Sequence, residues 1–165
     1  MTDDRKADWL RAARALPRGS VVVVRARDVA RRRALAEELY GSARLLIADD
    51  PALAGEIGAV GLHLPEERMR QAGHWRARHP DWIITSSAHS LGALMGAHHL
   101  DAVFLSPVFA TTSHSNAKPL TPVRAAMIAS HAPVPVYALG GVTGRNAALL
   151  APSFSGIAAI TALMS

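Results

Sequence analysis

The chain has 165 residues, of which 50% are hydrophobic and only 5% aromatic, and its formal net charge at pH 7 is +5. This length suits a single domain over residues 1–165; the lack of cysteine excludes disulfides and thiol chemistry, and no apolar run of about 18 residues predicts a membrane span. The basic residues concentrate in amphipathic segments without interleaved aromatics, so solvated helix faces are favoured over a nucleic-acid surface, and a cytoplasmic protein is expected.

Short β-branched runs alternate with helical patterns along the chain. The predicted strands cover residues 20–26, 43–49, 59–64, 81–87, 100–107, 134–139 and 156–163. The predicted helices lie between them, at 29–41, 51–58, 66–79, 89–99, 121–131 and 143–151. This alternation predicts an α/β fold of βαβ units around a parallel sheet.

Two architectures fit this pattern: an open doubly wound sheet and a closed TIM (β/α)8 barrel. No G-x-G-x-x-G follows the first predicted strand, which counts against the open sheet. The length lies below the usual barrel minimum of about 200 residues, which counts against the barrel. Polar residues stand at the end of almost every predicted strand, as in barrels that build one site at that face, and the barrel is therefore preferred.

Two loops near the end of the chain suggest an anion site. The segment "LSPVFATTSHSNAKP" (105–119) gathers hydroxyls, an imidazole and a lysine after a strand, which fits either a solvated loop or an anion-holding loop. In "YALGGVTGRN" (137–146), two glycines precede a predicted helix that begins at Thr143, and Thr161 ends the next predicted strand. Backbone N–H groups and a helix start at such turns bind phosphate in many barrels, although a tight structural turn would look alike.

Seven short segments, in chain order, span nearly the whole sequence. They are "VVRAR" (23–27), "IADD" (47–50), "GLHLPE" (61–66), "SAHS" (87–90), "SPVFATTSH" (106–114), "LGGV" (139–142) and "ITA" (160–162). In this order they resemble the thiamine phosphate synthase family, including its thiazole tautomerase relatives.

The resemblance implies an enzyme of thiamine biosynthesis that joins hydroxymethylpyrimidine diphosphate to thiazole phosphate and releases pyrophosphate. It implies that Arg25 and Arg27 grip the diphosphate, that Ser87 lies near the substrate, and that Asp49 is a ligand of Mg²⁺. It also implies phosphate-binding residues in the later loops. These are Thr111, Ser113, Gly140, Gly141, Ile160 and Thr161.

Several positions depart from the family pattern, mainly at the pyrimidine and metal end. Val23 replaces a glutamine, Ala48 replaces an asparagine, and Arg68 stands where a second magnesium aspartate belongs. In the anion loop His114 replaces a lysine. Two alternatives to the synthase therefore stay open: a thiazole tautomerase-like isomerase with His114 as its acid–base group, and a non-catalytic relative that binds a phosphorylated ligand.

The first and last segments of the sequence indicate a shortened barrel. "MTDDR" is similar to the tail of the family's first strand, and "ITALMS" stops where the last helix would begin. The expected barrel therefore lacks most of strand one and the last helix, and a homo-oligomer is one way to cover the open edge. An engineered or misassigned start of the chain is an equal alternative.

Two further residues have simpler interpretations. His63, within its strand, is expected to be a packed or hydrogen-bonded barrel residue. Asp49 has a rival role as the N-cap of the helix that begins at Pro51.

Overall fold

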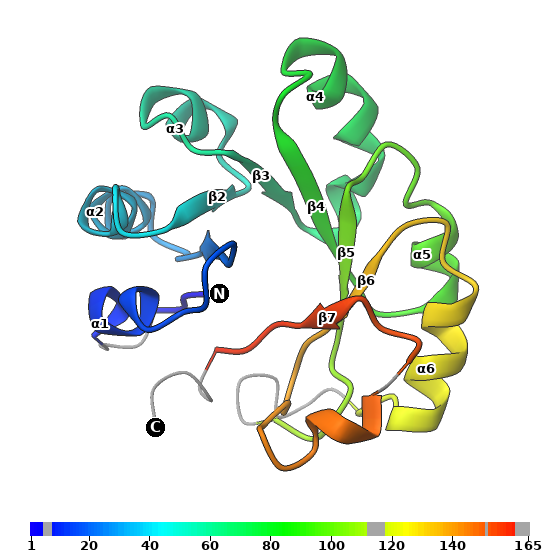
Figure 1. Ribbon diagram of the computed structural model, residues 1–165. Helices are drawn as coiled ribbons and strands as arrows, with labels where there is room; N and C mark the ends of the chain where they lie inside the picture. Colours follow the sequence, from blue (N-terminus) through cyan, green and yellow to red (C-terminus); the bar gives the residue numbers. More distant parts are fainter. Residues whose placement is uncertain (5–7, 112–117, 151, 161–165) are drawn as a thin grey trace.

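Figure 1 shows the computed structural model of the chain, which describes residues 1–4, 8–111, 118–150 and 152–160. Its centre is one seven-stranded parallel sheet in which neighbouring strands follow the order of the sequence. The strands are β1 (Val21–Val24), β2 (Arg44–Ala48), β3 (Gly61–Leu64), β4 (Ile83–Ala88), β5 (Ala102–Leu105), β6 (Val136–Ala138) and β7 (Gly156–Ile157). A parallel sheet built in sequence order curves toward closure, and the fold is an incomplete barrel.

Helices surround the outer side of this sheet (Figure 1). They are α1 (Trp9–Arg14), α2 (Val29–Leu39), α3 (Pro51–Glu56), η1 (Glu66–Gln71), α4 (Ala72–Arg78), α5 (Leu91–Met95), α6 (Pro122–Ser130) and η3 (Ala147–Leu150), where η marks a 3₁₀ helix. Short polar side chains fix several helix starts, because Asp28 accepts a hydrogen bond from Arg31 N and Ser90 from Ala93 N. Within the described residues, no helix is long and apolar enough to cross a membrane.

The core has an outer layer and a smaller inner one. The outer layer packs strand residues such as Leu62 and Val103 against the helices, and these side chains are fully buried. Inside the sheet, Val23, Leu46 and Ala48 form a separate cluster. Burial on both faces explains why the strands read as nearly continuous apolar runs.

The N-terminal residues connect the two edges of the sheet. The backbone nitrogen of Met1 donates to the carbonyl oxygen of Ala159 at 3.1 Å. Thr2 N donates to Val23 O at 2.9 Å, so residues 1–2 link the segment after β7 to β1. This link brings the two ends of the described chain together at one end of the barrel.

The structure supports the predicted alternation and corrects three details. Each predicted strand overlaps an observed one, but the eight-stranded barrel is not shown, because the described residues form seven strands. The helix predicted over 143–151 is only the short turn η3, so Thr143 does not begin an α-helix. Asp50 rather than Asp49 caps α3, since its side chain accepts from Leu53 N at 3.0 Å.

Candidate functional site

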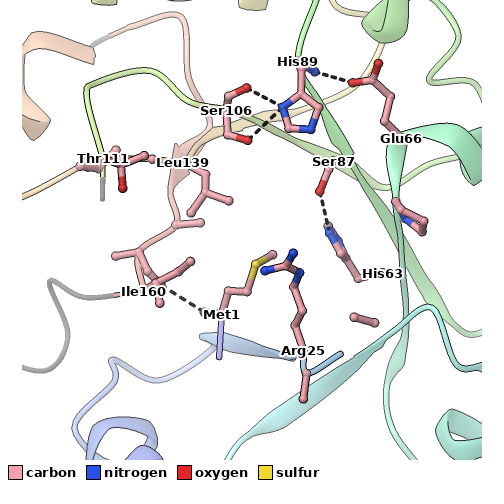
Figure 2. A pocket seen from close by; sticks show the side chains of 18 of the residues that line it. Met1, Arg25, His63, Glu66, Ser87, His89, Ser106, Thr111, Leu139 and Ile160 are labelled. Atoms are coloured by element: carbon pink, nitrogen blue, oxygen red, sulfur yellow. Dashed lines mark hydrogen bonds between the residues drawn. The ribbon is translucent and has the colours of Figure 1, made fainter. Parts of the chain in front are cut away.

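A cavity of about 1070 Å³ opens at the carboxyl ends of the strands. Each of the seven strands is followed by at least one residue that lines this cavity, and Met1 lines it as well. Parallel strands bring these strand ends to one edge, which is where ligands bind in α/β barrels. Figure 2 shows Arg25 and His63 on one side of the cavity and Thr111, Leu139 and Ile160 across from them.

All the predicted site residues that the structure describes line this cavity. They are Arg25, Arg27, Asp49, Ser87, Thr111, Gly140, Gly141 and Ile160. The other predicted positions, Ser113, His114 and Thr161, lie outside the described residues. We call the part around Arg25, Arg27 and Asp49 the arginine end, and the part around Ser106, Thr111, Gly140 and Gly141 the glycine end.

Arg25 is fixed by its backbone, while its side chain reaches into the cavity (Figure 2). Arg25 N donates to Thr2 Oγ1 at 2.8 Å, and the same hydroxyl donates to Arg25 O at 3.0 Å. Its guanidinium forms no ion pair with a described residue, whereas that of the neighbouring Arg32 is paired with Asp50 at 3.2 Å. A positioned, unpaired guanidinium beside a cavity is suited to an anionic ligand.

His63 is a buried residue of the cavity wall that is hydrogen-bonded through both ring nitrogens, and the sequence predicted such a packed or hydrogen-bonded role. Its Nδ1 lies 2.9 Å from Thr85 Oγ1 and its Nε2 lies 3.0 Å from Ser87 Oγ. Burial, with the positive charge of Arg25 as the next cause, lowers the pKa of His63 to about 3. The ring is therefore neutral at physiological pH, and it orients the Ser87 hydroxyl at the cavity wall.

His89 was missed as a site residue, because its position before a helix suggested only a helix start. Its Nδ1 lies 2.7 Å from the carbonyl oxygen of Ser106, and its backbone N–H donates to Glu66 at 2.6 Å. A carbonyl only accepts, so Nδ1 carries a proton and Nε2 of the neutral ring is an acceptor. Nε2 makes no hydrogen bond with the described residues, and His89 lines the cavity. The signal was present in "SAHS" (87–90), where the imidazole directly follows a strand.

The glycine end depends on close backbone packing. Gly140 and Gly141 have φ of 88° and 65°, which favour glycine. A Cβ added at Gly140 would lie 2.8 Å from Pro107 Cα, and one added at Gly141 would lie 2.3 Å from Ala110 O. A larger residue at either position would displace the loop after β5, which carries Thr111. The glycines are therefore needed first to bring two loops together, and only then to present backbone to a ligand.

Asp49 and Arg68 form an ion pair at the arginine end. Arg68 Nη1 lies 2.8 Å from Asp49 Oδ1, with side-chain exposures of 52% and 36%. Arg68 is not among the residues that line the cavity, but its hydrogen-bond partner Asp49 is. Among the described residues, no group of three acidic, histidine or cysteine side chains could hold a metal ion. The carboxylate that the resemblance assigns to Mg²⁺ is therefore already paired with a guanidinium, which makes it a poor metal ligand in this arrangement.

Comparisons with known proteins find relatives with a common description. A family model described as thiamine monophosphate synthase matches residues 2–163. The thiamine-phosphate synthase of Azorhizobium caulinodans is 33% identical over 158 residues, covering 88% of this chain and 74% of the relative. That of Lysinibacillus sphaericus is 35% identical over 123 residues, covering 72% and 57%. The chain thus spans little more than half the length of several curated relatives that it matches.

A solved structure supports the fold. The thiamine phosphate pyrophosphorylase from Pyrococcus furiosus superposes with a TM-score of 0.78, covering 99% of this chain and 85% of that chain. The two sequences are 21% identical, so this likeness concerns the fold alone.

Proposed function

The chain belongs to the thiamine monophosphate synthase family, and on this premise we propose that its cavity joins hydroxymethylpyrimidine diphosphate to thiazole phosphate. The observation that carries the proposal is that Arg25, Thr111 and Gly141, from distant parts of the sequence, line one cavity. The arginine end would hold the diphosphate, and the glycine end would hold the thiazole phosphate.

The reaction needs charge stabilisation and alignment more than a strong acid or base. The thiazole nitrogen forms a bond to the pyrimidine methylene carbon while the bond from that carbon to the diphosphate oxygen breaks. Pyrophosphate leaves with the electron pair of the broken bond. The Arg25 guanidinium stabilises the charge that develops on this oxygen, and the hydroxyl of Ser87, oriented by His63, bounds the space between the two substrates.

At the glycine end, backbone groups and a hydroxyl would meet the thiazole phosphate. The amides of Gly140 and Gly141 donate to no described residue, and Thr111 lies on the adjacent loop. Ser113, Ile160 and Thr161 belong to the same proposed phosphate set, and Arg27 to the diphosphate set. A cytoplasmic location and a homo-oligomer remain predictions beside this proposal.

The proposal is tested by mixing purified protein with both substrates and measuring thiamine phosphate and pyrophosphate. We expect one pyrophosphate for each thiamine phosphate, and calorimetric binding of each substrate alone. The matched control is the Arg44→Ala variant, because Arg44 is an exposed residue at the opposite end of β2. Binding of neither substrate would contradict the proposal.

A second candidate is a thiazole tautomerase-like isomerase, and the geometry of His89 favours it. Its Nε2 is an acceptor at the cavity wall, suited to remove a proton from one substrate atom and return it to another. His114, the acid–base residue proposed from the sequence, lies outside the described residues. Binding of thiazole phosphate without binding of the pyrimidine diphosphate, together with deuterium exchange into a thiazole carboxylate phosphate that His89→Gln abolishes, would select this function.

A further inference from the structure

The ion pair between Asp49 and Arg68 lies where the resemblance implies that a divalent cation binds. Asp49 has a φ of 54°, a conformation that Asp adopts more readily than most residues. Its backbone nitrogen donates to His63 O at 2.9 Å, which fixes the residue at the cavity edge. Arg68 comes from η1, which packs beside β3 and β4. The pair therefore joins two parts of the scaffold at a defined position.

We propose that the Arg68 guanidinium takes the place of the divalent cation, so that this cavity binds the pyrophosphate group without a metal ion. The inference rests on the proposed function for the identity of the ligand. Two aspartates with one divalent cation sum to zero charge, and so does Asp49 paired with Arg68. An aspartate-to-arginine exchange thus supplies the two units of positive charge that the cation would bring.

The other acidic residues near the Asp49–Arg68 pair are Glu66, Asp50 and Glu67, and two of them have hydrogen-bond partners of their own. Glu66 accepts a hydrogen bond from His89 N, and Asp50 caps α3 while it pairs with Arg32. Glu67 lines the cavity, but within the described residues it belongs to no group of three acidic, histidine or cysteine side chains that could hold a metal ion. The residues outside the described ranges include no Asp or Glu. The described residues thus offer Mg²⁺ no cluster of three such side chains, and Asp49, the carboxylate expected to bind it, is paired with Arg68.

A guanidinium can bridge a carboxylate and a phosphate. It carries five N–H donors in one plane, and the pair with Asp49 uses Nη1. The remaining donors of Arg68 stay available for pyrophosphate oxygens at the rim. Arg25 supplies a second guanidinium from inside the cavity, and Arg27 a third from the same strand end. Arg68 is half exposed, so it can meet the ligand at the entrance without rearrangement of the core.

The test titrates the protein with inorganic pyrophosphate by calorimetry, once in EDTA and once with Mg²⁺. We expect wild-type protein to bind pyrophosphate in EDTA, and Arg68→Gln to weaken that binding about tenfold, the loss typical of a charge-assisted contact. The matched control is Arg70→Gln, because Arg70 is an exposed arginine of the same helix without an ion pair to a described residue.

A second readout follows metal binding directly, without pyrophosphate. Electron paramagnetic resonance of added Mn²⁺ is expected to show no bound ion with wild-type protein and bound ion with Arg68→Asp, which restores a second carboxylate beside Asp49. Thermal melting checks that each variant is folded.

The outcomes separate this inference from the function beneath it. Pyrophosphate binding that requires Mg²⁺ in wild-type protein, or Mn²⁺ bound by wild-type protein, would overturn the inference and leave the proposed function standing. Equal pyrophosphate affinity of Arg68→Gln and wild type in EDTA would also overturn it. Absence of pyrophosphate binding under both conditions would overturn the inference together with the diphosphate part of the proposed function.

Discussion

The two ends of the cavity are built by different means. The glycine end is held by backbone, with Gly140 and Gly141 packed against the loop after β5 so closely that no Cβ fits. At the arginine end, the Arg25 and Asp49 side chains project from the scaffold, and Asp49 forms a partly exposed ion pair with Arg68. Packed backbone tolerates almost no change, whereas exposed charges can be exchanged at little cost in stability. We therefore expect substitutions to cost more stability at the glycine end than at the arginine end.

The largest expected effect comes from filling the space at the glycine end. Gly141→Ala forces a residue with a Cβ into φ of 65° and into Ala110 O, so we expect a loss of about 3 kcal/mol in the free energy of unfolding. Affinity for thiazole phosphate should fall at least tenfold, because the Thr111 loop moves. Urea denaturation and calorimetry measure the two quantities.

Gly58→Ala is the matched control for this prediction. Gly58 has nearly the same φ, 67°, but open space around it, so only the backbone strain of about 1 kcal/mol remains. Equal losses in the two variants would show that packing against the loop contributes nothing at the glycine end.

At the arginine end, the expected effect is on binding alone. Removal of the unpaired guanidinium by Arg25→Ala should weaken pyrophosphate binding by about 2 kcal/mol, within the usual range for hydrogen bonds to charged groups. The unfolding midpoint in urea should change little, because the side chain has no ion-pair partner in the described chain. Calorimetry compares the pyrophosphate affinities of Arg25→Ala and Arg44→Ala. Equal affinities would show that Arg25 does not bind pyrophosphate.

His63 lies on the same side of the cavity as Arg25, and its burial predicts a pH dependence of stability. Its pKa is lowered to about 3 in the folded protein, from an unperturbed value near 6.5. Between these values the unfolded state binds a proton that the folded state does not. The contribution of His63 to the free energy of unfolding is therefore fully present above pH 6.5. It falls by about 1.4 kcal/mol per pH unit as the pH drops from 6.5 toward 3.

Urea denaturation between pH 7 and pH 5 measures this slope. His63→Asn should flatten it, whatever its effect on absolute stability, and His98→Asn, a change at an exposed histidine, should not. A slope that His63→Asn leaves unchanged would contradict the burial argument.

The smallest expected effect concerns the support of Arg25. Thr2→Val removes the hydroxyl that both accepts from Arg25 N and donates to Arg25 O, at a buried position. We expect a loss of about 1 kcal/mol in unfolding free energy and a weaker affinity for pyrophosphate. Thr2→Ser keeps the hydroxyl and should restore most of both. Equal losses in Thr2→Ser and Thr2→Val would contradict this prediction, because the hydroxyl that Thr2→Ser keeps would then not account for the effect.

The strands and the general place of the site were predictable, because both follow from local patterns. Buried parallel strands read as β-branched runs, and polar residues at strand ends converge wherever such a sheet curves. The burial of His63 was likewise predicted from its place within a strand.

The details that sequence reasoning missed depend on contacts between distant residues. The tautomer of His89 is set by the carbonyl of Ser106, and the partner of Asp49 comes from a different loop. The α-helix predicted over 143–151 does not form as predicted, and the reason is local. Asn146 Oδ1 accepts a hydrogen bond from Thr143 N, and Asn146 Nδ2 donates one to Gly141 O. The Asn146 side chain therefore closes a turn where helical hydrogen bonds were expected. Asparagine competes with helical hydrogen bonds in this way, and the apolar pattern alone does not reveal it.

The link between Met1 and Ala159 has a consequence for how the protein folds. These residues are 158 positions apart, so their hydrogen bond closes nearly the largest loop that the chain can form. Each neighbouring strand pair joins residues only a few tens of positions apart and can form early, whereas closure of the ring bears the full entropy of a long loop. The junction of the chain's two ends, and with it the wall of the cavity beside Arg25, should therefore be the last part of the molecule to become ordered.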